Sequence, residues 1–176
     1  MYIEETLLPE VKIYTPKRFQ DERGFFFESF NQKYFKEHSF VQDNHSCSSK
    51  NVVRGLHYQL VKPQGKLVRV VAGSILDVAV DIRKSSPTFE QWVSVELTAD
   101  NGKQLWVPPG FAHAFMALED NTQVLYKTTE YWYKEYDRSI RWNDEQLSIA
   151  WPNLDLAILS QKDLEAPSLS KADLFD

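Results

Sequence analysis

The sequence predicts an all-β domain whose antiparallel strands form a sandwich or a barrel. From Val41 onward, short apolar runs rich in β-branched residues follow one another closely, and Gly, Pro, Asn, Asp or Ser separates each run from the next. No helical periodicity intervenes between them, which disfavours a parallel sheet with crossover helices. The runs span residues 51–60, 66–71, 74–82, 91–97, 103–110, 113–118 and 123–132.

Length and composition bound the possibilities further. The chain has 176 residues, of which 43% are hydrophobic and 14% aromatic, as expected for one ordered domain. Its net charge of −5 argues against nucleic-acid binding, which requires a cationic surface. No apolar run is long enough to span a bilayer, and residues 1–10 lack the features of a signal peptide. Cys47 is the single cysteine, so no intramolecular disulfide can form. We therefore expect a cytoplasmic, membrane-free protein.

The N-terminal third predicts a hairpin followed by a short helix. Residues 11–16 and 25–30 flank a polar turn, and strand alternation turns Phe26 and Glu28 away from Phe25 and Phe27. An outward-facing Phe26 is consistent either with a second small core or with a dimer interface. Residues 31–40 space Tyr34, Phe35 and Phe40 among helix-compatible residues, and we predict a helix there.

Polar side chains interrupt the apolar strand at residues 51–60. Alternation places Arg54, Tyr58 and Leu60 on one face, and Val53, Gly55, His57 and Gln59 on the other. His57 and Gln59 then point the same way, as polar groups do when they line a cavity. The next strand adds Lys66 and Arg69.

The end of the chain departs from the strand pattern. After residue 137 the apolar residues lose their periodicity, and Trp142 and Trp151 lie among Asn, Asp and Pro. We predict that residues 138–176 pack irregularly on the outside of the β-structure. The composition of SQKDLEAPSL is by itself that of a surface loop.

One spacing narrows the fold class. Gly102, Pro108, Gly110 and His113 follow the pattern of the second motif of the cupin superfamily, whose small jelly-roll barrels place this histidine inside the barrel. The resemblance implies an all-β, cupin-type jelly-roll barrel with a few short peripheral helices.

The other cupin motif departs from its metal-binding form. Where that form has paired histidines and a glutamate, this chain has His57, Gln59 and Lys66. An ammonium group repels a divalent cation, so we predict a pocket without metal.

A metal-free pocket with these groups suits proton removal next to a carbonyl. A neutral imidazole at His57 can accept the proton, and the ammonium of Lys66 can stabilise the enolate oxygen. Tyr126, on a later strand, can return a proton from the opposite side. A base on one side and an acid on the other produce inversion.

The whole chain resembles the dTDP-4-dehydrorhamnose 3,5-epimerases of rhamnose biosynthesis. The matching segments are DERGFFFES, QDNHS, RGLHYQ, QGKLVRV, DVAVDIR, SPTF, GFAHAF, LYKTT, WND, WP and SQKD. The resemblance implies one domain over residues 1–176 that acts as a homodimer, with residues 1–30 at the interface, shared active sites and no cofactor. Its expected substrate is a dTDP-linked 4-keto-6-deoxyhexose.

The resemblance also implies roles for individual residues. His57 is similar to the general base of the family, Asp163 to the carboxylate that orients it, Lys66 to the enolate-side lysine and Tyr126 to the proton donor. Phe26 is similar to the ring that reaches across from the partner subunit and stacks on thymine against the equivalent of Trp132. The remaining expected substrate contacts are Arg23, Glu28, Gln42, Asp43, Asn44, Arg54, Gln59, His113, Asp137 and Lys162.

Two departures from the family pattern leave substrate preference open. Cys47 stands where basic residues are common, and Ala114 stands where glycine is usual, which predicts a narrower pocket near the sugar. A relative that inverts one carbon or moves the keto group remains the nearest alternative. A metal-dependent cupin oxygenase or isomerase and a non-catalytic sugar-binding module are more remote.

Overall fold

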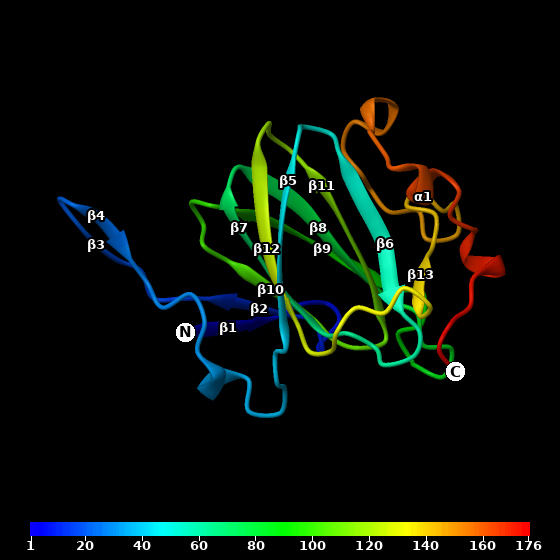
Figure 1. The fold of residues 1–176 in the computed structure, drawn as a ribbon, viewed down its shortest axis with the longest axis horizontal. Coiled ribbons are helices and arrows are strands. Elements are labelled where there is room, and N and C mark those ends of the chain that lie inside the picture. Colours follow the sequence, from blue (N-terminus) through cyan, green and yellow to red (C-terminus); the bar gives the residue numbers. More distant parts are fainter.

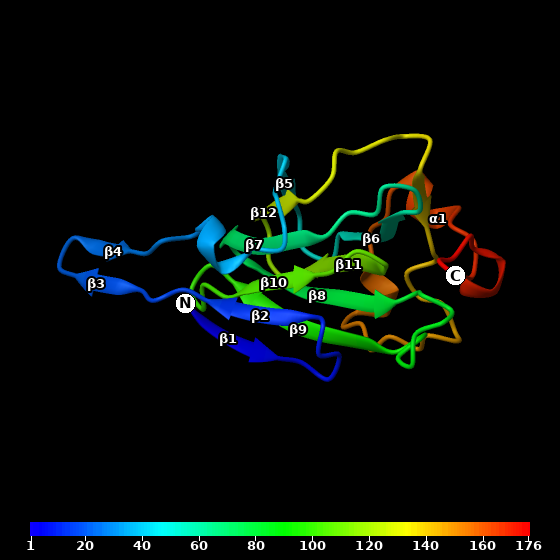
Figure 2. The ribbon, with the colours of Figure 1, turned by 90° about the horizontal axis from the view of Figure 1, so that it is seen from below.

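The computed structural model describes residues 1–176 and confirms the all-β prediction. Two antiparallel sheets face each other and form a flattened barrel (Figures 1 and 2). One sheet has the strand order β1-β2-β10-β7-β12-β5 and the other has the order β13-β6-β11-β8-β9. The strands are β1 (Tyr2–Glu5), β2 (Lys12–Thr15), β3 (Phe19–Asp21), β4 (Gly24–Phe26), β5 (Gln42–Ser48), β6 (Val53–Gln59), β7 (Lys66–Ala72), β8 (Ser74–Asp81), β9 (Trp92–Thr98), β10 (Gln104–Val107), β11 (Phe111–Ala117), β12 (Thr122–Thr128) and β13 (Asp137–Ser139).

Helices are few and short. The only α-helix is α1 (Gln161–Leu164), and the 3₁₀ turns are η1 (Gln32–Tyr34), η2 (Leu154–Leu156) and η3 (Leu169–Lys171). None of these is long and apolar enough to cross a membrane.

The five-stranded sheet is buried on both faces. Its inner face packs on the six-stranded sheet through a cluster that includes Val68, Ile75 and Phe115. Its outer face is covered by the chain after residue 139, where Trp142 and Trp151 join strand residues in a second cluster. This outer layer brings α1 next to β6 (Figure 1). The irregular C-terminal segment therefore has a definite place in the fold, close to the residues that β6 carries.

The predicted helix at residues 31–40 is wrong. Only η1 forms there, begun by Asn31, whose side chain accepts a hydrogen bond from the backbone of Lys33. Phe35 is instead buried in a small aromatic cluster with Tyr14 and Trp106 on the outer face of the six-stranded sheet. Tertiary packing of aromatic rings outweighs the weak local helix propensity in this segment.

Strands β3 and β4 form a two-stranded hairpin that pairs with neither sheet. This hairpin, which we call the arm, projects well away from the barrel in both views (Figures 1 and 2). Phe25 stacks on Phe27, whereas Phe26 is 71% exposed. The arm therefore presents a large apolar ring that nothing in its own chain covers.

The alternation predicted for β6 is wrong between residues 54 and 57. The pairing with β11 shifts register between His113 and Phe115, so that two residues, Gly55 and Leu56, lie opposite one residue of β11. Gly55 has φ +123°, and a Cβ there would lie 2.5 Å from that of Ala114, so only glycine fits. Because the irregularity resets the alternation, Arg54 and His57 both line the cavity described below.

Candidate active site

Residues of both sheets and of the C-terminal layer line a cavity of about 440 Å³, which adjoins a second cavity of about 320 Å³. His57, Lys66 and Tyr126 line both. The first also contains Arg54, His113 and Asp163, and the second contains Gln42, Asn44, Trp132, Asp137 and Lys162. Eleven of the residues expected at the site thus share one continuous depression.

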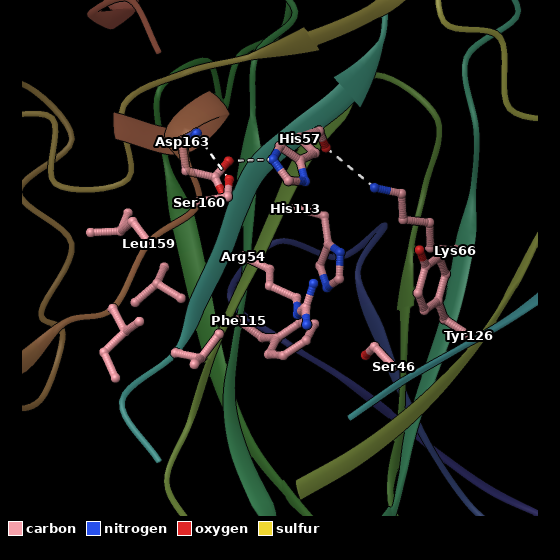
Figure 3. Close-up of a pocket in the computed structure, with 13 residues that line it drawn as sticks. Ser46, Arg54, His57, Lys66, His113, Phe115, Tyr126, Leu159, Ser160 and Asp163 are labelled. Carbon is pink, nitrogen blue, oxygen red and sulfur yellow. Dashed lines mark hydrogen bonds and ion pairs between the residues drawn. The ribbon is translucent and has the colours of Figure 1, made fainter. Parts of the chain in front are cut away.

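His57 and Asp163 form a hydrogen-bonded pair. The Nε2 atom of His57 lies 2.5 Å from Oδ1 of Asp163, and the carboxylate is almost fully buried while the imidazole remains 29% exposed (Figure 3). Because a carboxylate accepts rather than donates, Nε2 carries the proton and Nδ1 keeps its lone pair. Nδ1 of His57 is therefore the basic atom of the pair.

Burial and hydrogen bonding set the protonation states of this pair. Burial lowers the pKa of His57 below its ordinary value, and the attraction of Asp163 offsets only part of that effect. Burial acts to raise the pKa of Asp163, but hydrogen bonds from His57 and Ser160, with the charge of Lys162, bring it below its ordinary value. Near neutral pH the pair is a neutral imidazole beside an ionised carboxylate.

Lys66 lies on the facing sheet and is 8% exposed. Its Nζ donates to the backbone oxygen of His57 at 3.3 Å (Figure 3). Burial lowers the pKa of Lys66 to about 8, against the opposing effect of Asp137 and Asp77. The side chain therefore remains mainly protonated at pH 7, as a cation poorly neutralised by protein groups.

Tyr126 lies beside Lys66 on the same wall. On the paired strands β7 and β12, Tyr126 is opposite Val68 and Thr128 is opposite Lys66, which places Lys66 and Tyr126 on one face. Burial raises the pKa of the Tyr126 phenol, which keeps it protonated at neutral pH. His57 belongs to the five-stranded sheet, so the basic atom and the phenol occupy opposite walls (Figure 3).

A second histidine–carboxylate pair lies deeper in the barrel. Nε2 of His113 is 2.5 Å from Oδ1 of Asp77, and both side chains are buried. The other carboxylate oxygen of Asp77 has no hydrogen-bond partner. Asp77 is not among the residues expected at the site, although a carboxylate within the apolar run 74–82 is a sign that it faces a cavity or a partner.

Cationic and aromatic groups line the outer part of the site. Arg54 donates to the hydroxyl of Ser48 at 3.1 Å, which fixes its guanidinium at the cavity wall. Lys162 lies 2.5 Å from the carboxylate of Asp137. Trp132 is 53% exposed, and its backbone N–H donates to Gln42 at 3.0 Å.

The structure does not meet two of the expectations, one for Asp43 and one for Ala114. Asp43 lies on the outer face of β5 and forms a 2.9 Å ion pair with Lys127, because alternation sends its neighbours Gln42 and Asn44 inward. Ala114 does not narrow the pocket, since it faces the core cluster behind the five-stranded sheet.

Gln59 is not a cavity residue. Its Nε2 donates to the backbone oxygens of Lys62 at 2.7 Å and Tyr131 at 3.0 Å. Its Oε1 accepts from the backbone N–H of Tyr133 at 2.8 Å. The bonds to Tyr131 and Tyr133 hold the backbone on both sides of Trp132, so the side chain of Gln59 supports the loop that carries this ring.

Three further expected contacts lie on or near the arm, away from the cavities of their own chain. Arg23 forms an exposed ion pair with Asp21, and Glu28 accepts a hydrogen bond from Asn31. Arg23 and Phe26 line only a shallow depression formed by the arm itself.

The donor set does not suit a divalent metal ion. Each of the two cavity histidines already donates its Nε2–H to a carboxylate, and the ammonium of Lys66 faces the same space. No three His, Cys, Asp or Glu side chains gather in a way that would hold an ion. The arrangement fits proton transfer with a fixed cation rather than metal ligation.

Comparison with known proteins gives a consistent assignment. Residues 5–171 match the family model described as dTDP-4-dehydrorhamnose 3,5-epimerase. The Salmonella typhimurium enzyme of that name is 54% identical over 178 residues, which cover 98% of this chain and 97% of the relative. A Legionella pneumophila dTDP-6-deoxy-D-glucose-3,5-epimerase, crystallised with dTDP-4-keto-L-rhamnose, has 49% identity and a TM-score of 0.95, covering 98% of this chain and 94% of that one.

A more distant structure has a different specificity. The Streptomyces bikiniensis 3'-monoepimerase ChmJ, in complex with dTDP-quinovose, is 30% identical with a TM-score of 0.89, covering 94% of this chain and 87% of that one. The fold is therefore shared between enzymes that are named for double and for single inversion. At about half identity over nearly the full length, this chain belongs to the dTDP-4-dehydrorhamnose 3,5-epimerase family.

Proposed function

We propose that this protein is a cofactor-independent epimerase that inverts C3 and C5 of dTDP-4-dehydro-6-deoxy-D-glucose, giving dTDP-4-dehydro-L-rhamnose. The observation that carries the proposal is the placement of His57, paired with Asp163, opposite Lys66 and Tyr126 in one cavity. The family and the ligand of the Legionella structure support the same substrate class.

We assign one task to each group. Nδ1 of His57 removes a proton from a carbon next to the C4 ketone, and Asp163 stabilises the imidazolium that results. The ammonium of Lys66 stabilises the negative charge on the enolate oxygen. Tyr126 then donates a proton from the facing wall, so that the carbon is inverted. Repetition at the second carbon gives the doubly inverted sugar.

We further propose that two copies of the chain share their sites through the arm. Phe26 and Arg23 lie on this projecting hairpin, far from the cavity of their own chain, while the exposed ring of Trp132 lines that cavity without a stacking partner of its own. An arm from a second copy would add Phe26 against thymine on Trp132 and Arg23 toward the pyrophosphate. Arg54 and Lys162 supply the cationic groups of the chain that owns the cavity.

The decisive experiment follows the ketosugar nucleotide in deuterated buffer by NMR. The proposed function predicts one solvent deuteron at C3, one at C5, and the L-rhamno configuration in the product. A His57→Asn variant should lose both incorporations while binding dTDP normally. Deuterium at one carbon, with a product inverted only there, would instead support a monoepimerase, the alternative raised by the similarity to ChmJ.

A further inference from the structure

The second carboxylate oxygen of Asp163 has one side-chain hydrogen-bond donor, the hydroxyl of Ser160. Oδ1 of Asp163 accepts from His57, and Oδ2 accepts from Oγ of Ser160 at 2.8 Å (Figure 3). The carboxylate is buried, and Ser160 is the only group besides His57 whose side chain bonds to it. The two bonds together fix the plane of the carboxylate against the imidazole ring.

The same serine also begins α1. Ser160 is the N-cap residue, and its hydroxyl oxygen accepts from the backbone N–H of Asp163 at 3.2 Å. One hydroxyl therefore fixes both the main chain and the side chain of Asp163. Because Ser160 itself is solvent-exposed, replacing it leaves no cavity in the core.

We propose that Ser160 is a positioning residue for the proton-transfer pair, acting through Asp163 rather than on the substrate. This inference rests on the proposed role of His57 as base. Without the hydroxyl, Oδ2 of Asp163 loses its donor, and the carboxylate is free to rotate away from the imidazole plane. Turnover then falls because His57 is held less often in the productive orientation and tautomer.

The loss of this hydrogen bond also changes the basicity of His57. The hydrogen bond to Asp163 raises the pKa of His57, so a carboxylate that rotates away from the ring lets that pKa fall further below its ordinary value. Other groups facing the pair stay in place: Lys162 on α1, Lys66 on β7 with Tyr126 beside it on β12, and His113 with Asp77 behind. A change in the titration of His57 on replacing Ser160 therefore reports the bond to Asp163.

The test compares Ser160→Gly with Ser160→Thr. Glycine is accepted at an N-cap with little loss of helix stability but has no hydroxyl, whereas threonine keeps both hydrogen bonds. Ser168→Gly is the matched control, because Ser168 is the N-cap of η3 and its side chain makes no capping bond. We expect Ser160→Gly to lower kcat about tenfold with KM nearly unchanged, and Ser160→Thr and Ser168→Gly to keep the parent values.

A measurement without substrate separates this inference from the proposed function. In ¹⁵N NMR titrations, with the His57 resonance assigned by its absence in His57→Asn, the pKa of His57 should be lower in Ser160→Gly than in the parent protein and should return to the parent value in Ser160→Thr. An unchanged titration and an unchanged kcat would overturn the inference. A higher KM with unchanged kcat would also overturn it, by assigning the hydroxyl to substrate binding. Failure of the unmodified protein to epimerise the ketosugar would instead reject the proposed function.

Discussion

His57 and Asp163 lie 106 positions apart in the chain, yet Nε2 of one is 2.5 Å from Oδ1 of the other. The histidine comes from a central strand and the carboxylate from a one-turn helix in the irregular C-terminal layer. The layer that covers the back of the barrel therefore also completes the proton-transfer pair at its cavity.

Replacing Asp163 should disturb the orientation of His57 while leaving nucleotide binding intact. In Asp163→Asn the amide can donate to the imidazole, which favours the tautomer whose lone pair faces away from the substrate. We expect kcat to fall on the order of 10³-fold while the Kd for dTDP changes little. Steady-state kinetics and calorimetric titration with dTDP check this. A variant that retains nearly full kcat would contradict the role assigned to the carboxylate.

Tyr126→Phe should uncouple the two halves of each inversion. The variant keeps His57 and Lys66, so proton removal and return on the His57 side continue, whereas protonation from the facing wall does not. We expect solvent deuterium to wash into unconverted substrate while product formation falls roughly 10²-fold to 10⁴-fold. NMR of the substrate pool in deuterated buffer measures both rates. Complete loss of exchange would mean that Tyr126 has a different task.

The pH dependence of kcat/KM should be bell-shaped. His57 must be neutral to act as base, so activity should rise with pH on the acid side of the profile. Because the pKa of His57 lies below its ordinary value, the midpoint of this rise should lie below about pH 6.5. Lys66 must be protonated, and its pKa is about 8, so activity falls as the pH rises through that value.

Two variants test whether Lys66 causes the fall in activity at high pH. Lys66→Arg should move it to higher pH, because a guanidinium stays protonated. Cys47→Ser is the control, since Cys47 is an exposed thiol outside both cavities and its removal should leave the profile unchanged. An alkaline limb that persists in Lys66→Arg would exclude Lys66 as its source. Tyr126 does not compete for this assignment because burial raises the pKa of its phenol.

Shared active sites predict complementation between two inactive variants. Phe26→Ala removes the ring of the arm, and His57→Asn removes the base inside the barrel. In a mixed dimer, one site carries both defects and the other carries none. Because one of its two sites is intact, the mixed dimer should have about half of the parent activity. Co-expression with two affinity tags, followed by assay of the doubly selected fraction, measures this. Activity no higher than in either variant alone would indicate that the arm serves its own chain.

Gln59 should affect nucleotide binding rather than chemistry. Gln59→Leu leaves the carbonyl of Tyr131 and the N–H of Tyr133 in the Trp132 loop, and the carbonyl of Lys62 in the turn after β6, without their partner. The cost is on the order of 1–3 kcal/mol for each group that stays buried. A looser Trp132 should raise KM and the Kd for dTDP roughly tenfold with kcat little changed. Gln64→Leu is the matched comparison, because Gln64 makes one bond to the same loop, at Glu130. A lowered kcat with unchanged KM in Gln59→Leu would contradict this interpretation.

Much of the architecture and several site residues can be predicted from the sequence, because both depend on local order along the chain. Alternating apolar residues and turn residues indicate the strands, and the Gly-Pro-Gly-His spacing indicates the barrel. His57, Lys66 and His113 are recognisable as site residues because polar groups in apolar strands must face a cavity or a partner. The same alternation within β5 would have placed Asp43 on the outer face.

Tertiary structure alone decided the remaining features, since they depend on contacts between distant segments. Pairing with β11 introduced the irregularity at Gly55 and Leu56 that turned Arg54 toward the cavity, and aromatic packing replaced the expected helix at residues 31–40. The hydrogen bond between His113 and Asp77 likewise forms only when their strands pair, and the bonds from Gln59 to the Trp132 loop form only when that loop packs on β6. A local pattern predicts which face of a strand a side chain occupies, but the segment that packs on that face determines which groups the side chain contacts.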